Sequence, residues 1–296
     1  MENAPPPQEV EMSERLLNRI ALITGAGSGI GAAAARRLAT EGAKVAVVDI
    51  NGAAADAVAN EISEGGGEAI SLVADVTQGA QVEAAFEETL RRFGRLDVLL
   101  ANAGGFPDLF PVGECPEESW RRVLDVNLTG VYLCVKAALR PMRRQKSGVI
   151  LATASMAGLI PMTAGIEYSV SKTGVIMLMR HVAQVYGPDG IRAIAICPGW
   201  VDTPFLKPIW EAVGGWTGKS ALRAMAPLGR MATPEDVAAS VVFLASDEAS
   251  FISGAAFTID GGATAGIPTR QGPPTRGYLA LRRGVRRLFG KSTPRL

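Results

Sequence analysis

Residues 24–31 read TGAGSGIG, and they stand between an apolar run, RIALIT, and a helix-like run, AAAARRLATEG. The glycines Gly25, Gly29 and Gly31 allow a sharp turn and let the backbone approach a pyrophosphate closely. The N-terminus of the following helix offers free N–H groups and the positive end of a dipole. This stretch therefore indicates a strand, a turn and a helix arranged to bind a dinucleotide.

Asp49 ends the next apolar run, KVAVVDI, 18 residues after Gly31. An acidic side chain at that place can accept hydrogen bonds from both hydroxyls of an adenosine ribose. A 2′-phosphate would meet a like charge there, and TGAGSGIG contains no Lys or Arg to offset it. We therefore expect NAD rather than NADP as the cofactor. The alternative is an ordinary aspartate that ends the strand and caps the next helix.

Continuous apolar runs recur along the whole chain, and most are separated by stretches with helical spacing. Runs of this kind are typical of strands that are buried on both faces. Alternating strands and helices predict right-handed crossover units and a parallel sheet covered on both sides. We expect an α/β protein with a doubly wound Rossmann fold in one domain. Its seven predicted strands lie at 19–24, 44–50, 69–76, 96–104, 148–155, 191–199 and 255–262.

The composition is that of a soluble globular protein, with 48% hydrophobic and 20% charged residues. A net charge of +1 argues against a chain-wide basic surface for nucleic acid. The three cysteines are far apart, without a CxxC pair, so neither a disulfide framework nor a metal site is expected. No apolar run is long enough to cross a membrane, and the N-terminus lacks the pattern of a signal peptide. We expect a cytoplasmic protein.

The two ends of the chain differ from the middle in composition. Residues 1–15 are polar and Pro-rich and predict a disordered leader, so the folded unit is expected over 16–266. Residues 1–262 contain 22 basic and 29 acidic residues, a net charge of −7, whereas the remainder carries +8. Within 267–296, a Pro/Gly linker precedes GYLALRRGVRRLFGK, which would form a basic amphipathic helix. Such a segment can bind an anionic membrane surface or an acidic partner weakly; the alternative is disorder or packing against a neighbouring subunit.

A tyrosine and a lysine four residues apart form the next motif, YSVSK. On a helix, Tyr168 and Lys172 would share a face, with Cβ atoms about 5–6 Å apart. Ser155 ends the run GVILATAS, at a strand terminus where open α/β sheets place their ligands. A nearby ammonium favours the phenolate and would lower the tyrosine pKa. Tyr168 could then act as a general acid or base near neutral pH.

With these motifs in this order and spacing, residues 16–262 resemble the short-chain dehydrogenase/reductase family, in its single-domain branch marked by TGxxxGxG, NAG, a serine and YxxxK. The resemblance implies that Tyr168 donates and accepts the proton and that Ser155 holds the substrate oxygen. Lys172 would bind the nicotinamide ribose and depress the tyrosine pKa. Asn127 is similar to the family asparagine that holds a proton-relay water. The resemblance also implies a homo-oligomer, a tetramer, in which helices at 117–144 and 166–186 pack across a two-fold axis.

The remaining cofactor-binding residues follow from the same resemblance. The NAG motif supports the cofactor cleft, a DV pair lies beside the adenine, and the segment CPGWVDT stands where PGxVxT binds the carboxamide. The usual NNAG reads ANAG here, which we expect to affect packing more than chemistry. With Tyr168 and Lys172, the expected contacts are Gly25, Ser28, Gly29, Ile30, Gly31, Asp49, Asp75, Val76, Asn102, Ala103, Gly104, Pro198, Gly199, Val201 and Thr203.

The loops that face the predicted cleft are mainly apolar, which favours a secondary alcohol or ketone, with an alicyclic one as the preferred class. We expect hydride transfer between this substrate and NAD. The side chains expected in the pocket are Phe106, Phe110, Met156, Leu159, Phe205, Ile209 and Trp210.

Other functions explain the sequence less well. A serine hydrolase would need a histidine, and the one histidine, His181, stands in the helix that continues from YSVSK; GxSxG is also absent. The extended branch of the same superfamily uses TGxxGxxG, whose middle glycine is replaced here by Ser28. A non-catalytic NAD-binding scaffold or regulatory protein remains the alternative, although such relatives usually lose the tyrosine or the lysine.

Overall fold

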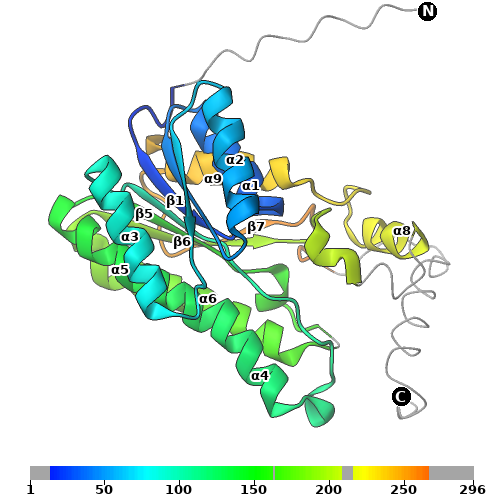
Figure 1. Ribbon diagram of the computed structural model, residues 1–296. Helices are drawn as coiled ribbons and strands as arrows, with labels where there is room; N and C mark the ends of the chain where they lie inside the picture. Colours follow the sequence, from blue (N-terminus) through cyan, green and yellow to red (C-terminus); the bar gives the residue numbers. More distant parts are fainter. Residues whose placement is uncertain (1–13, 163, 209–215, 267–296) are drawn as a thin grey trace, which may run out of the picture.

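A computed structural model describes residues 14–162, 164–208 and 216–266 of the chain. Within these residues seven strands form one sheet in the order β3-β2-β1-β4-β5-β6-β7, and every neighbouring pair is parallel. The chain order reverses between β1 and β4, so this is the doubly wound arrangement that the sequence predicted (Figure 1). The strands are β1 (Ile20–Thr24), β2 (Lys44–Asp49), β3 (Ala69–Val73), β4 (Val98–Ala101), β5 (Gly148–Thr153), β6 (Ile191–Pro198) and β7 (Ala256–Ile259).

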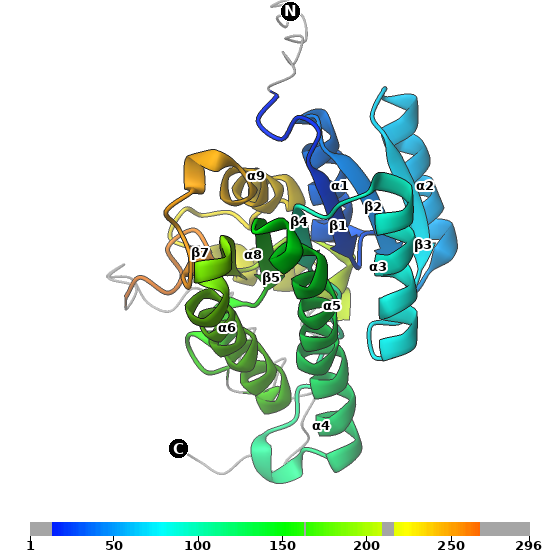
Figure 2. The ribbon, with the colours of Figure 1, turned by 90° about the vertical axis from the view of Figure 1, so that its left-hand side faces the viewer.

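Helices cover both faces of the sheet. Side chains of α1, α2 and α9 join the core on one face, and those of α3, α5 and α6 join the core on the other, as Figure 2 shows. Successive residues of a central strand alternate between the two cores, as Ala21, Leu22 and Ile23 do in β1. This explains why the strands read as continuous apolar runs. The helices are α1 (Gly29–Thr40), α2 (Gly52–Glu64), α3 (Gly79–Phe93), α4 (Glu117–Leu124), α5 (Gly130–Gln145), α6 (Ile166–Tyr186), α8 (Trp216–Met225) and α9 (Pro234–Ala245).

The helical spacing over 117–144 is not carried by one uninterrupted helix. A π-helical turn, Asp125–Thr129, joins α4 to α5, and the Gly130 N–H donates to the carbonyl of Asp125. π-Helical turns inside helices occur frequently at functional sites. This one contains Asn127, whose side chain is fully buried.

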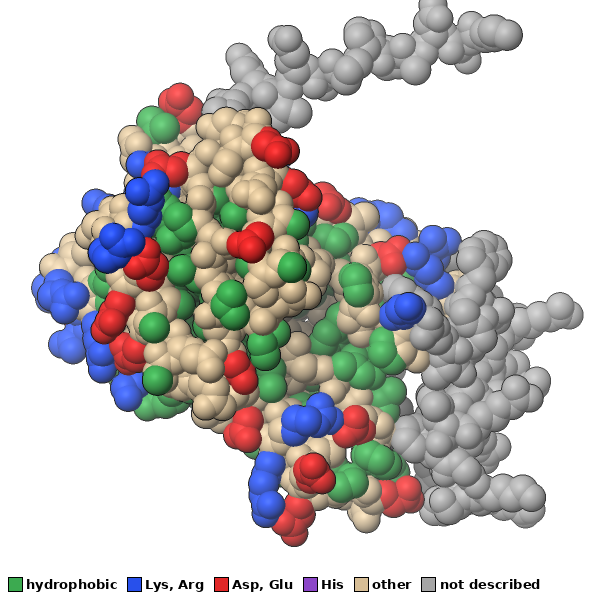
Figure 3. All heavy atoms as spheres, viewed as in Figure 1, with side chains coloured by type: hydrophobic (Ala, Val, Ile, Leu, Met, Phe, Trp, Pro, Cys, Tyr) green, Lys and Arg blue, Asp and Glu red, His purple; other side chains and the backbone are tan. Residues whose placement is uncertain are grey.

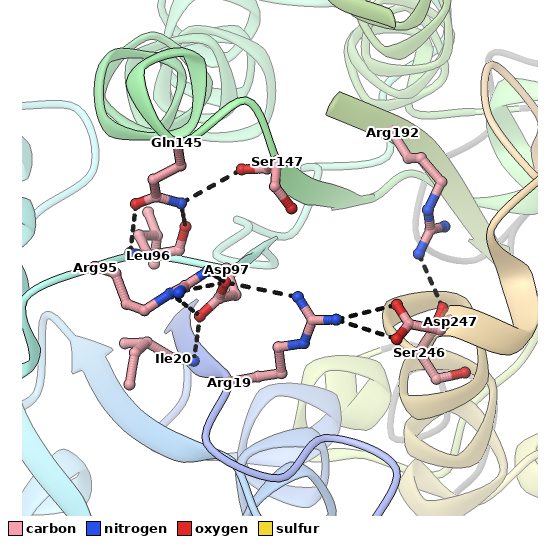
Figure 4. A network of polar contacts seen from close by, with 10 residues as sticks. All are labelled: Arg19, Ile20, Arg95, Leu96, Asp97, Gln145, Ser147, Arg192, Ser246 and Asp247. Atoms are coloured by element: carbon pink, nitrogen blue, oxygen red, sulfur yellow. Dashed lines mark hydrogen bonds and ion pairs between the residues drawn. The ribbon is translucent and has the colours of Figure 1, made fainter. Parts of the chain in front are cut away.

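A polar network ties together the amino ends of the strands, at the edge of the sheet opposite the turn TGAGSGIG (Figure 4). The buried Asp97 accepts hydrogen bonds from the backbone N–H of Ile20 at 2.9 Å and from the guanidinium of Arg95. Arg19 lies between Asp97 and Asp247 and forms ion pairs with both. The network therefore joins β1 and β4 to the segment after α9, and it leaves the carboxyl edge of the sheet free for a ligand.

Residues 1–13 of the expected leader and the basic tail lie outside the described residues, as do Ile209 and Trp210. The described part begins close to the sheet, where Leu16 is buried and its N–H donates to the carbonyl of Glu41. None of the helices in this part is both long enough and apolar enough to cross a bilayer.

Candidate active site

A cavity of about 400 Å³ opens at the carboxyl ends of the strands. Hydrophobic side chains border the hollow on the face shown in Figure 3. All but two of the residues expected to bind the cofactor or to act in catalysis line this cavity. The two exceptions, Gly31 and Asn127, are buried directly behind its wall. The tertiary structure thus brings together residues that are up to 178 positions apart in the chain, from Gly25 to Thr203.

The glycine turn after β1 has the conformation and the close contacts that only glycine allows. Gly25 has φ +63°, and a Cβ there would lie 2.8 Å from the Cα of Ala103. A Cβ on Gly31 would lie 2.1 Å from the carbonyl oxygen of Gly25. Because neither position has room for a side chain, the backbone of the turn stays open toward the cavity.

Helix α1 begins in this turn with its positive end toward the cavity. Its N-cap residue, Ser28, makes no capping hydrogen bond through its side chain, and the first turn contains no acidic residue. The N-terminal N–H groups of a helix require partners, and the helix dipole favours an anion there. Together with the bare glycine turn, this end of α1 fits the pyrophosphate of a dinucleotide.

Asp49 lies at the end of β2 with its carboxylate fixed by two backbone groups. Oδ2 accepts from the N–H of Gly27 at 2.8 Å, and Oδ1 accepts from the N–H of Asn51 at 2.9 Å. Among the described residues that line the cavity, Lys172 is the only cationic one. The wall beside Asp49 therefore offers negative charge and hydrogen-bond acceptors, which suit ribose hydroxyls and repel a phosphate.

Asn102, the first residue of the NAG motif, braces the cofactor end against the catalytic end. Its Nδ2 donates to the carbonyls of Thr24 and Gly25, both at 3.2 Å. Its Oδ1 accepts from the hydroxyl of Thr153 at 3.0 Å. Asn102 therefore connects the glycine turn after β1 to the end of β5, where the catalytic residues meet.

The three predicted catalytic side chains meet at the end of β5. The hydroxyl of Ser155 lies beside the phenol of Tyr168, where it favours the phenolate. The ammonium of Lys172 lies 5.5 Å from the centre of the Tyr168 ring and donates to the carbonyl of Thr153 at 2.8 Å. Two oxygen atoms that can exchange protons thus face the cavity, with a cation behind them.

The acid–base properties of this group differ from the expectation drawn from the sequence. Burial raises the pKa of Tyr168 to about 12, and the hydrogen bond from Ser155 lowers it only in part. Burial also lowers the pKa of Lys172 to about 8. In the protein by itself burial decides the pKa of Tyr168, and the effect of Lys172 on that pKa stays a prediction. Both groups are removed from water, which disfavours the charged form of each.

Asn127 is held behind the catalytic residues by the backbone of Gly105. Its Oδ1 accepts from the Gly105 N–H at 2.8 Å, and its Nδ2 donates to the Gly105 carbonyl at 3.0 Å. A Cβ on the neighbouring Gly104 would lie 3.0 Å from Asn127 Oδ1 and 3.8 Å from Lys172 Nζ. The glycine of NAG therefore leaves the space between Asn127 and Lys172 open.

Apolar side chains form the wall beside Tyr168. The ring of Phe205 lies 5.2 Å from the ring of Phe106, edge to face, and 6.2 Å from the ring of Tyr168. Two of the expected pocket residues are placed elsewhere: Leu159 is exposed, and Phe110 does not line the cavity. Other members of the same loops take their place. The apolar residues of these loops that line the cavity include Phe106, Pro107, Leu109, Met156, Met162, Trp200, Phe205 and Leu206.

The sequence analysis missed Thr153, which joins two parts of the site through its carbonyl and its hydroxyl. Its position in β5 carried a usable signal, because residues two apart in a strand point to the same face and Ser155 follows two residues later. His181 is exposed on α6 and does not line the cavity. In the described part of the chain, no group of three His, Cys, Asp or Glu side chains could hold a metal ion.

Known proteins are similar to this chain over most of its length. A family model described as enoyl-(acyl carrier protein) reductase matches residues 25–264. The chain is 42% identical over 254 residues to cis-4-hydroxycyclohexanecarboxylate dehydrogenase of Sinomonas cyclohexanicum, with 86% of this chain and 100% of that protein covered. It is 38% identical over 253 residues to cyclohexanol dehydrogenase of Acinetobacter sp. (strain SE19), with 86% and 98% covered.

Solved structures are similar over the same region. The crystal structure of levodione reductase matches with a TM-score of 0.82 at 36% identity, covering 85% of this chain and 100% of that one.

Proposed function

The chain belongs to the short-chain dehydrogenase/reductase family of oxidoreductases, and from this premise we propose that it is an NAD-dependent alcohol dehydrogenase or ketoreductase. The observation that carries the proposal is the meeting of Ser155, Tyr168 and Lys172 at one wall of the cavity. Their oxygen and nitrogen atoms provide a proton acceptor, a hydrogen-bond partner for a carbinol oxygen and a cation within one site.

The residues of this chain would divide the proton chemistry as follows. In the direction of oxidation, the phenolate of Tyr168 takes the proton of the substrate hydroxyl, while Ser155 donates a hydrogen bond to the same oxygen. When bound, NAD supplies the acceptor for the hydride that leaves the carbinol carbon. Lys172 binds the nicotinamide ribose. Asn127 supports the proton relay from its place behind Gly104. Asn102 holds the glycine turn and the end of β5 in fixed relative positions through its hydrogen bonds to Gly25 and Thr153.

NAD rather than NADP is proposed because of Asp49. Its carboxylate is held by two backbone N–H groups and faces the part of the cavity that follows β2. The remaining contacts would come from the glycine turn, from Asp75 and Val76 beside the adenine, and from the segment between Pro198 and Thr203 beside the nicotinamide.

An apolar secondary alcohol or its ketone is proposed as the substrate, with an alicyclic ring as the preferred class. The cavity wall beside Tyr168 is built from apolar side chains. The names of two relatives, a cyclohexanol dehydrogenase and a hydroxycyclohexanecarboxylate dehydrogenase, point to the same class. The alternative function, a non-catalytic NAD-binding scaffold, would leave this wall and the Ser155–Tyr168 hydrogen bond without a use.

One experiment separates the enzyme from the scaffold. Purified protein is supplied with cyclohexanol and NAD⁺, and formation of NADH is followed by its absorbance. Turnover that requires the alcohol supports the proposed function. NADH binding without turnover of cyclohexanol, of its ring-substituted derivatives or of open-chain secondary alcohols would contradict it and would favour the scaffold.

A homotetramer in the cytoplasm is the assembly and location that we propose. Helix α6 presents an exposed apolar stripe of Val170, Met177 and Val185, and Tyr132 is exposed on the neighbouring α5. Residues seven or eight apart lie on one face of a helix, so these three side chains share a face of α6. These are the helices that the family resemblance implies at a two-fold interface.

A further inference from the structure

Phe205 occupies a firmly supported position beside the cavity. It belongs to a short 3₁₀ turn, Pro204–Leu206, that follows β6. The next residue, Leu206, is buried and packs with Leu222 of α8 and with Met231, and Phe205 packs against this cluster. The turn is therefore attached to α8 by apolar contacts.

The segment before Phe205 is anchored as well. Val201 forms a parallel bridge with Ala232, and the N–H of Asp202 donates to the Ala232 carbonyl at 2.8 Å. The carboxylate of Asp202 forms an ion pair with Lys219 of α8. Because both flanks are held, the backbone sets the direction in which the Phe205 ring points.

The ring itself joins three segments of the chain at the catalytic tyrosine. Its centre lies 5.2 Å from that of Phe106, which follows β4, with an angle of 71° between the ring planes. It lies 6.2 Å from the centre of Tyr168 of α6, with an angle of 41°. Aromatic pairs prefer offset or edge-to-face arrangements at such separations. Phe205 is thus an apolar wall directly beside the group that would handle the proton.

We propose that Phe205 is the specificity-determining residue of this site and that its ring limits the substrate to secondary alcohols and ketones with a single small ring. The inference rests on the proposed function. When the carbinol carbon of the substrate lies at Tyr168, its two neighbouring carbons must fit beside the Phe205 ring. A single alicyclic ring would meet this wall with apolar surface, whereas a second fused ring would require the space that the Phe205 ring occupies. Hydrophobic pockets discriminate by size in this way, by roughly 10–200-fold for each methylene group.

The same contact affects the proton chemistry. Burial raises the pKa of Tyr168 to about 12, and the Phe205 ring covers part of the tyrosine. Removal of the ring admits water, so the pKa of Tyr168 should fall. The pH profile therefore provides a second readout, which a general loss of packing far from the site would not change.

The test compares Phe205→Ala with wild type on cyclohexanol and on a fused bicyclic alcohol, decahydronaphthalen-2-ol, both with NAD⁺. We expect kcat/KM for cyclohexanol to fall at least about tenfold, mainly through KM, and kcat/KM for the bicyclic alcohol to rise. The rising limb of the kcat/KM profile for cyclohexanol, which reports deprotonation of Tyr168 to the active phenolate, should move to lower pH. Phe205→Leu keeps much of the apolar volume, so its kcat/KM values should lie between those of wild type and Phe205→Ala. This variant preserves the test if the alanine variant does not fold.

Phe251→Ala is the matched control, because Phe251 is fully exposed and does not line the cavity. This substitution should leave kcat/KM for both alcohols and the pH profile unchanged. An unchanged ratio between the two alcohols in a folded Phe205→Ala protein that still binds NADH would overturn the inference and leave the proposed function standing. Wild-type protein that oxidised neither alcohol and no other secondary alcohol would overturn both.

Discussion

Lys172 and Thr153 are joined by a hydrogen bond of 2.8 Å between the lysine ammonium and the threonine carbonyl. The bond crosses from α6 to the end of β5 and places the ammonium 5.5 Å from the centre of the Tyr168 ring. The hydroxyl of the same threonine donates to Asn102, which in turn holds the glycine turn. One threonine therefore couples the position of the cofactor cradle to that of the catalytic cation.

Tyr168→Phe removes the phenolic oxygen and keeps the ring. We expect kcat to fall by about 10²–10⁴-fold, the range typical of a general acid–base group. NADH binding, measured by the change in cofactor fluorescence, should be kept, because the cradle at Gly25 and Asp49 is untouched. A phenylalanine variant with near wild-type kcat would show that another group transfers the proton.

Asp49→Asn removes the negative charge and keeps a side chain of the same shape. We expect wild type to prefer NAD over NADP by at least about tenfold in kcat/KM, and the variant to gain about tenfold or more with NADP. The effect should weaken as ionic strength rises. Asp56→Asn is the control, since this substitution makes the same charge change at an exposed residue of α2. Equal use of both cofactors by wild type would contradict the assignment of Asp49.

Lys172→Met tests the burial of the lysine through its effect on stability. Burial lowers the pKa of Lys172 to about 8 in the folded protein, against about 10.4 in an unfolded chain. Below pH 8 the lysine is protonated in both states. Between these two values the unfolded state binds more protons, so the stability of wild type relative to the variant should rise with pH, by on the order of 3 kcal/mol in full.

Melting temperatures of both proteins between pH 7 and about pH 10.5 measure this difference. Lys136→Met, which removes an exposed lysine from α5, is the control for loss of a lysine. Parallel curves for wild type and Lys172→Met would mean that Lys172 titrates alike in both states, which would contradict the lowered pKa.

Met177→Glu places a charge in the centre of the apolar stripe on α6, where Met177 is 59% exposed. If this stripe packs across a two-fold axis, buried charges would face each other and the assembly should dissociate. Light scattering should give about four times the 30.9 kDa chain mass for wild type and a smaller species for the variant. Leu17→Glu, at an exposed leucine before β1, should leave the mass unchanged. A monomeric wild type would refute the tetramer.

The local parts of the fold and the site could be predicted from the sequence. The seven strands were visible because each is mainly apolar, and the structure confirms all seven. The glycine turn was visible because a short stretch of backbone determines where glycine is required. Tyr168 and Lys172 share a helix, so their spacing alone placed them on one face.

The pocket was predicted only in part. The loops that follow β4 and β5 were correctly expected to face the cleft, but Leu159 proved exposed and Phe110 does not line the cavity. Irregular loops have no period from which the direction of a side chain follows. The direction depends on which neighbouring segments the loop packs against.

What the sequence by itself determined is the set of groups that are close along the chain: the strands, the glycine turn before α1 and the tyrosine–lysine pair of α6. The tertiary structure alone decided what these groups experience. It brought Phe106 and Phe205 together from positions 99 residues apart, it tied Lys172 to Thr153, and it buried Tyr168 until its pKa rose instead of falling. The physical reason is that desolvation and side-chain packing depend on every neighbour in space, whereas the sequence specifies only the neighbours along the chain.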